Sequence, residues 1–139
     1  MQAVEQLFAV YTQALDDRRF ENLESVLAEE VEFTFLNGAQ KLGPLHGFAQ
    51  AAAFIRRTVE GLPGRRTHQI RNLTLMQELP DGARVHASLL RTIYRDEKTV
   101  EGHSRGSYEV DLSRDRYGRW RFQRVLVRLD DPLPGDIER

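Results

Sequence analysis

The 139-residue chain contains no cysteine, which excludes disulfides, thiolate metal ligands and a cysteine nucleophile. An excess of charge of one sign is also missing, because 20 lysines and arginines balance 21 acids and leave a formal net charge of −1. This balance, without a basic stripe, argues against a nucleic-acid or membrane-surface partner. No apolar run reaches membrane-spanning length, and the N-terminus lacks the charged-then-apolar layout of a signal peptide. We therefore expect a cytoplasmic protein.

Motifs for common cofactors are missing as well. The sequence has no glycine-rich phosphate loop, no GxSxG elbow and no dinucleotide fingerprint. Its four histidines, at positions 46, 68, 86 and 103, show no HxH or HExxH spacing. We expect neither a metal nor an organic cofactor.

The composition is that of a globular domain, with 40% hydrophobic and 29% charged residues. A chain of this length forms one domain and can bury a core without covalent staples. Two prolines and a glycine in the segment DDPLPGDIER predict a loosely structured end. The expected division is a domain over residues 1–131 and a C-terminal tail over residues 132–139.

Hydrophobic periodicity predicts helices in the first half of the chain and strands in the second. The three predicted helices cover residues 4–15, 20–27 and 47–59. The five predicted strands cover residues 31–35, 67–75, 84–95, 104–113 and 119–129. This order favours an α+β fold. We expect three N-terminal helices packed on a strongly curved antiparallel or mixed sheet that forms a cone with an internal pocket.

Polar residues interrupt the apolar faces of two predicted strands. In RRTHQIRNLTL, His68 and Asn72 share the parity of Ile70, so the strand directs an imidazole and an amide inward. One interpretation is a proton-transfer histidine that borders a pocket, and the other is a core histidine with its hydrogen bonds satisfied. In the last strand, the parity of Trp120 places Arg124, together with residues 126 and 128, on the same inward face. Those arginines either meet a ligand or extend to solvent at the edge of the sheet.

The end of the first helix carries an unfavourable charge. Asp16 lies where the helix dipole disfavours an anion by a few tenths to about 1 kcal/mol. Asp17 could cap the second helix, which explains one acid and leaves Asp16 unexplained. Tyr11 lies on the apolar stripe one turn before Leu15, where a buried phenol usually has a hydrogen-bond partner. Local conflicts of this kind gather at functional sites.

Three stretches carry a family resemblance: YTQALDDRRFENLESVLAEEVEF at residues 11–33, THQIRN at 67–72 and GSYEVDLSRDRYGRWRFQRVLVRLDD at 106–131. Together they cover almost the full chain. They resemble the SnoaL-like branch of the nuclear transport factor 2-like (ketosteroid isomerase-like) superfamily. The resemblance implies a cone-shaped fold and homodimers. It does not imply one reaction, because this fold serves enzymes, binders and assembly subunits.

One subgroup of that superfamily has the most similar site pattern. It includes scytalone dehydratase, bile-acid 7α-dehydratase and hexachlorocyclohexane dehydrochlorinase, which use an Asp–His pair. By resemblance, Asp16 and His68 occupy the positions of that pair, and Tyr11 and Arg128 match a tyrosine and a last-strand arginine of the bile-acid enzyme. The ketosteroid isomerase mechanism does not transfer, because its base aspartate is replaced by residues 33–35, Phe-Thr-Phe. Ser107 or Tyr108 lies near the position of its oxyanion-hole acid.

We therefore expect a cofactor-independent lyase or isomerase that dehydrates, eliminates or cyclises a hydrophobic, possibly polycyclic small molecule by general acid–base catalysis. The expected catalytic residues are Asp16, His68, Tyr11 and Arg128. The residues expected to line the substrate pocket are Asn72, Phe33, Phe35, Phe54, Ile55, Leu90, Tyr108, Trp120, Arg124 and Leu126. The alternatives are a non-catalytic small-molecule binder and a partner subunit similar to the small subunit of ring-hydroxylating dioxygenases.

Overall fold

The computed structural model describes residues 2–61 and 64–130, so the predicted tail at 132–139 lies outside the described residues. The helical segments are α1 (Gln2–Asp16), the 3-10 helix η1 (Phe20–Ser25) and α2 (Phe48–Glu60). The strands are β1 (Leu27–Asn37), β2 (Gln40–His46), β3 (Arg65–Leu79), β4 (Gly82–Tyr94), β5 (Val100–Arg114) and β6 (Trp120–Leu129). These elements confirm the α+β class.

The helices lie where periodicity predicts them, but the second is a 3-10 helix. Phe20, Leu23 and Val26 recur every three residues, which matches three residues per turn and places them on one side. Leu23 and Val26 are fully buried. The segment is short, with six residues, as is usual for this helix type.

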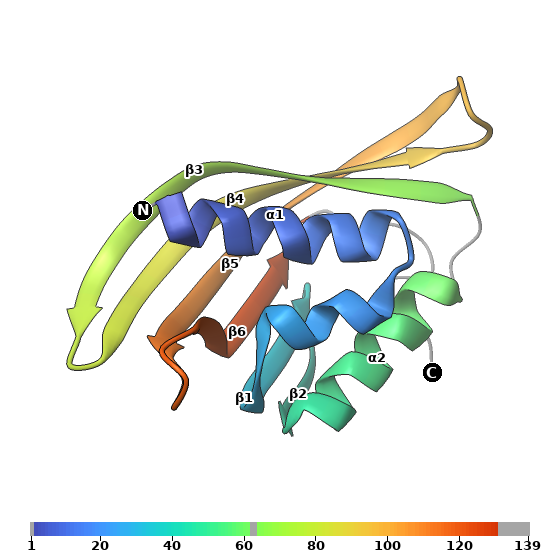
Figure 1. Ribbon diagram of the computed structural model, residues 1–139. Helices are drawn as coiled ribbons and strands as arrows, with labels where there is room; N and C mark the ends of the chain where they lie inside the picture. Colours follow the sequence, from blue (N-terminus) through green and yellow to red (C-terminus); the bar gives the residue numbers. More distant parts are fainter. Residues whose placement is uncertain (1, 62–63, 131–139) are drawn as a thin grey trace.

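The six strands form one open mixed sheet in the order β2-β1-β6-β5-β4-β3. β1 and β6 run parallel, and the other neighbours run antiparallel. Figure 1 shows β3 and β4 arching around α1, with α2 packed near β1 and β2. β2 was not predicted, because Gly43 and Pro44 separate its two leucines and remove the alternation typical of a strand.

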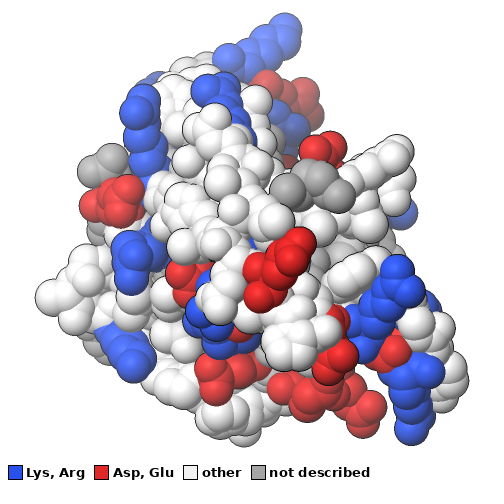
Figure 2. Space-filling view, turned by 90° about the vertical axis from the view of Figure 1, so that its left-hand side faces the viewer, with Lys and Arg blue, Asp and Glu red and all other residues white. Residues whose placement is uncertain are grey.

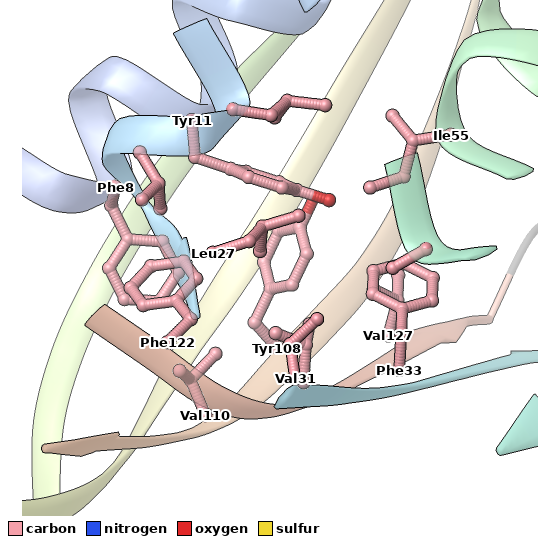
Figure 3. Packing of buried hydrophobic residues seen from close by; sticks show 14 of the residues in the cluster. Phe8, Tyr11, Leu27, Val31, Phe33, Ile55, Tyr108, Val110, Phe122 and Val127 are labelled. Atoms are coloured by element: carbon pink, nitrogen blue, oxygen red, sulfur yellow. The ribbon is translucent and has the colours of Figure 1, made fainter. Parts of the chain in front are cut away.

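The core lies between the helices and the concave face of the sheet. Figure 3 shows Phe8 and Tyr11 of α1 against Tyr108 of β5 and Phe122 of β6. The ring centroids of Phe8 and Phe122 are 5.0 Å apart, and the Tyr11 and Tyr108 rings meet edge-on at 5.8 Å. Tilted and edge-on contacts of this kind are the preferred arrangements of aromatic pairs. The aromatic cluster therefore fixes α1 over the centre of the sheet.

An irregularity in β6 decides which of its side chains enter this core. Leu112 is opposite Phe122, whereas Asp111 is opposite Arg124, so Gln123 is an extra residue in β6. Such a β-bulge breaks the strict alternation of faces. After the bulge the buried residues of β6 are Val125, Val127 and Leu129. The parity that continues from Trp120 is therefore wrong beyond Phe122.

A similar irregularity lies in β3. Arg71 is opposite Ser88 and Thr74 is opposite His86, so β3 takes three steps where β4 takes two. Asn72 lies at this bulge with φ of 55°. Asparagine tolerates the left-handed region better than most residues. The inward face of β3 accordingly contains Arg66, His68 and Ile70 before the bulge.

The surface shows no dominance of either charge. Figure 2 shows lysine and arginine side chains interspersed with acidic ones over one end of the molecule. None of the helices in the described part of the chain is long and apolar enough to cross a membrane.

Candidate active site

Asp16 and His68 are in direct contact, although 52 positions separate them in the sequence. His68 Nδ1 lies 2.7 Å from Asp16 Oδ1. The backbone N–H of His68 also donates to both carboxylate oxygens, at 3.1 and 3.2 Å. Because a carboxylate accepts and does not donate, Nδ1 carries a proton and Nε2 keeps its lone pair in the neutral ring. The predicted meeting of these two residues is confirmed.

The end of α1 places Asp16 at this position. Arg19 N–H donates to the Ala14 carbonyl at 2.9 Å, and Arg18 N–H donates to the Leu15 carbonyl at 3.3 Å. Arg18 has φ of 55°, so the helix closes with a Schellman motif that has arginine in the left-handed position usually taken by glycine. Asp16 is then the last residue of the helix and lies beside β3. The hydrogen bonds from His68 offset the unfavourable helix dipole.

The alternative role for the adjacent acid is wrong. The N-cap of η1 is Arg19, and no side chain donates or accepts a capping bond there. Asp17 is exposed.

A cavity opens beside the Asp16–His68 pair, between α1, α2 and the concave face of the sheet, with a volume of about 70 Å³. Its lining contains eight of the residues predicted for the site, namely Tyr11, Asp16, Phe33, Phe35, Phe54, Ile55, His68 and Tyr108. The aromatic rings from β1 and α2 pack against each other, and the Phe35 and Phe54 centroids are 5.5 Å apart. One wall of the cavity is therefore apolar, and the wall at Asp16 and His68 is polar.

Tyr11 and Tyr108 are hydrogen-bonded through their hydroxyls at the floor of the cavity, and Figure 3 shows the two hydroxyl ends close together. Burial raises the pKa of Tyr11 well above its usual value, and the neighbouring Tyr108 adds to the effect. Burial also raises the pKa of Tyr108, although the nearby Arg91 opposes this. Both phenols are therefore protonated at neutral pH and able to donate a hydrogen bond.

Two arginines in the cavity wall were not predicted. Arg66 and Arg91 are 8% and 5% exposed and both border the cavity. Arg91 lies opposite His68 in the β3–β4 register, and its Nη2 donates to Ser104 Oγ at 3.0 Å. The sequence contained a signal for each. Arg91 falls on the parity of the buried apolar residues of β4, and Arg66 on that of His68 and Ile70.

Three of the predicted site residues in β6 lie on the other face of the sheet. Arg128 is exposed, and Leu126 points away from the cavity. Arg124 donates to Glu109 Oε2 at 2.5 Å and to Asp111 Oδ2 at 3.1 Å. The predicted inward orientation of all three is wrong, because the bulge at Gln123 shifts the alternation by one residue.

Three further pocket assignments are also wrong. Leu90 lies between the buried residues Leu89 and Arg91, so it points to the outer face. Asn72 is exposed at the bulge in β3. Trp120 packs on the edge of the core, beneath the guanidinium of Arg114, and does not border the cavity.

The family follows from the match of the whole chain. The chain belongs to the SnoaL-like domain family, whose model matches residues 1–125. The helix–strand order and the open mixed sheet agree with the nuclear transport factor 2-like superfamily predicted from the sequence. No curated protein matches the chain. Within the described residues, no group of three histidine or acidic side chains could hold a metal ion.

Solved structures with the same fold have diverse roles. A scytalone dehydratase-like protein of Novosphingobium aromaticivorans is 20% identical, with a TM-score of 0.74 over 93% of this chain and 83% of that one. The hexachlorocyclohexane dehydrochlorinase LinA-type3 of Novosphingobium barchaimii is 19% identical, with a TM-score of 0.75 over 96% and 90%. The β subunit of an aromatic-ring-hydroxylating dioxygenase of Novosphingobium aromaticivorans is 14% identical, with a TM-score of 0.75 over 98% and 92%. At these identities the likeness shows the fold alone.

Proposed function

We propose that this protein is a cofactor-independent acid–base enzyme, a lyase or isomerase that acts on an apolar small molecule. The observation that supports the proposal most is the Asp16–His68 hydrogen bond at the wall of a cavity. The carboxylate holds the ring in one tautomer and orients it, as an acid does for a catalytic histidine in other enzymes. Nε2 is then the basic atom available for a proton.

The proposed reaction begins with proton abstraction from carbon. Nε2 of His68 takes a proton from a carbon next to an electron-withdrawing group, and the electron pair moves toward that group to give an enolate-like anion. In an elimination, the anion expels a leaving group on the next carbon, and the imidazolium returns its proton to a departing hydroxyl. In an isomerisation, the same proton returns to a different carbon. Positioned proton transfer of this kind contributes about 10² to 10⁴-fold in rate.

The tyrosine pair supplies a second element of the proposal. Tyr11 and Tyr108 are protonated phenols beside the cavity, so one hydroxyl can donate to the developing enolate oxygen. Arg128 was expected to share this role, but it lies on the outer face.

The cavity volume narrows the substrate. An apolar cavity of about 150 Å³ holds benzene, and this cavity measures about 70 Å³. We therefore propose a substrate with an apolar portion no larger than one ring inside the cavity, in place of the polycyclic molecule that the family resemblance suggests.

Hydrogen–deuterium exchange tests the role of His68. The protein is incubated in D₂O with small ketones and acids that have an activated C–H bond, and exchange at that carbon is followed by proton NMR. His68→Ala should lower the exchange rate at least a hundredfold. The matched control is His86→Ala, because His86 lies on the outer face of β4 and does not border the cavity. An exchange rate that His68→Ala leaves unchanged would contradict the proposal.

A second role is favoured by one observation, the similarity to a dioxygenase β subunit. In that role the chain would be a non-catalytic partner in a larger oxygenase. It predicts co-purification with a larger subunit and no exchange activity in the isolated protein. An isolated chain that exchanges substrate protons through His68 would exclude it as the sole function.

A further inference from the structure

The polar wall of the cavity has an unbalanced set of charges. Among the described residues that border it, Asp16 is the one acid, whereas Arg18, Arg65, Arg66 and Arg91 are basic. Two of these arginines, Arg66 and Arg91, are buried, and the other two are exposed at the mouth. The Asp16 carboxylate is engaged by His68. The remaining charge on this wall is therefore positive.

The two buried arginines extend from neighbouring strands on the same face. Arg91 is directly opposite His68, and Arg66 precedes His68 by two residues. Residues in these positions project side by side, with the diagonal pair about 7–8 Å apart at the backbone. The bond from Arg91 Nη2 to Ser104 Oγ, which is fully buried, fixes the orientation of that guanidinium. Both guanidinium groups thus lie within one side-chain length of the proposed base.

A guanidinium is suited to one class of ligand. Its planar array of N–H donors matches a carboxylate, and the charge-assisted bonds are stronger where water is displaced. Opposite this wall lie the rings of Phe33, Phe35 and Phe54, which suit an apolar group. A molecule that satisfies both walls is a small acid with an apolar portion.

We propose that Arg66 and Arg91 recognise a carboxylate, and that the ligand of this cavity is a small hydrophobic carboxylic acid. The inference rests on the proposed function only in placing the substrate in this cavity. A carboxylate held by the arginines would bring a nearby C–H bond of the same molecule toward His68 Nε2. Arg66 and Arg91 would then determine which substrates bind, and His68 would act on them.

Matched pairs of ligands test the proposal without a known substrate. Benzoate and cinnamate are compared with benzamide and cinnamamide, which keep the shape and lose the charge, by calorimetric titration or ligand-observed NMR at millimolar concentration. The protein should bind each acid about tenfold to a hundredfold more tightly than its amide, as expected for hydrogen bonds to a charged group. Arg66→Met and Arg91→Met should each reduce that ratio by about tenfold or more.

Two further variants separate this inference from the proposed function. Arg128→Met removes the same charge from the outer face and should leave the ratio unchanged. His68→Asn removes the proposed base but keeps both arginines, so it should abolish exchange and retain the preference for acids. A preference for acids together with exchange that survives in His68→Asn would refute the catalytic role alone.

The wild-type comparison decides the matter even if an arginine variant does not fold. Equal affinity for acid and amide, or no binding of either acid at millimolar concentration, would overturn the carboxylate site. A preference that persists in both Arg66→Met and Arg91→Met would overturn the assignment to these residues. The ratio should fall as salt is raised if charge carries it, since added ions screen the attraction.

Discussion

The two faces of the sheet both carry arginines, but in different surroundings. On the outer face, Arg84 donates to Asp111 at 2.7 and 3.0 Å, and Arg124 bridges Asp111 and Glu109. These groups come from three adjacent strands and are half-exposed, so they form an ion-pair network across the sheet surface. On the inner face, arginines border a cavity beside His68.

The difference shows that residue type alone does not identify a functional arginine. The outer arginines face carboxylates on neighbouring strands, and pairs of this exposure contribute little to stability individually. The inner ones occupy positions where alternation would place apolar side chains, next to the Asp16–His68 pair. Whether an arginine belongs to one group or the other depends on its register, and the register depends on the bulges.

The largest effect should come from breaking the assignment of faces in β6. Val125 is 1% exposed, whereas the next residue, Leu126, lies on the outer face. Val125→Asn should lower the free energy of unfolding by roughly 3–5 kcal/mol, because the amide would be buried without hydrogen-bond partners and would replace packed methyl groups. Leu126→Asn should lower it by roughly 1 kcal/mol. Urea denaturation measures both. Equal losses would mean that the bulge at Gln123 is misplaced.

The next effect concerns the acid on the inner side. Asp16→Asn keeps the shape of the side chain but lets the amide bind the other tautomer of His68. Proton exchange into substrate should then slow by about a hundredfold, which corresponds to about 2.7 kcal/mol of activation free energy. Asp17→Asn makes the same change one residue away, at an exposed position. It should leave the exchange rate within a factor of two or so. Comparable rates for both variants would remove Asp16 from the mechanism.

Much of this architecture could be predicted because it is periodic. The stripe through Phe8, Tyr11 and Leu15 predicts α1, and the three residues are buried as expected. Turns at residues 80–81, 95–98 and 116–117 follow from proline, glycine and acidic clusters and lie between the predicted strands. The contact of Asp16 with His68 could not be derived from periodicity, because nothing local specifies which strand passes the end of a helix. It was predicted through the family resemblance.

The wrong assignments have one physical origin. A bulge adds a residue to one strand without changing its hydrophobic composition, so every later side chain changes face. In β6 the extra Gln123 is polar like its neighbours, and no feature of the sequence marks it. In β3 a signal was available, since asparagine is among the residues that favour φ near 55° and Asn72 adopts it. Leu90 and Arg91 were exchanged for a simpler reason, because the leucine was taken as the inward residue on its apolarity alone.

The smallest effect sharpens the outer side of the comparison through its pH dependence. Burial raises the pKa of Asp111, but hydrogen bonds and charge from Arg84 and Arg124 outweigh burial and lower it overall. A carboxylate with a lowered pKa stabilises the folded state above its unfolded pKa of about 4, and this contribution is lost as the pH falls through the folded value. Asp111→Asn should therefore destabilise the protein by about 1–2 kcal/mol near neutral pH.

Urea denaturation at a series of pH values measures that contribution as the difference between wild type and Asp111→Asn. The difference should be constant from about pH 7 to 5 and should shrink toward zero below about pH 4, because both proteins then lack the charge. Asp81→Asn, in the exposed turn between β3 and β4, should show a difference under about 0.5 kcal/mol throughout. A difference for Asp111→Asn that does not change with pH would mean that its hydrogen-bonding shape, and not its charge, stabilises the outer face. The two faces would then differ in ligand access but not in their use of charge.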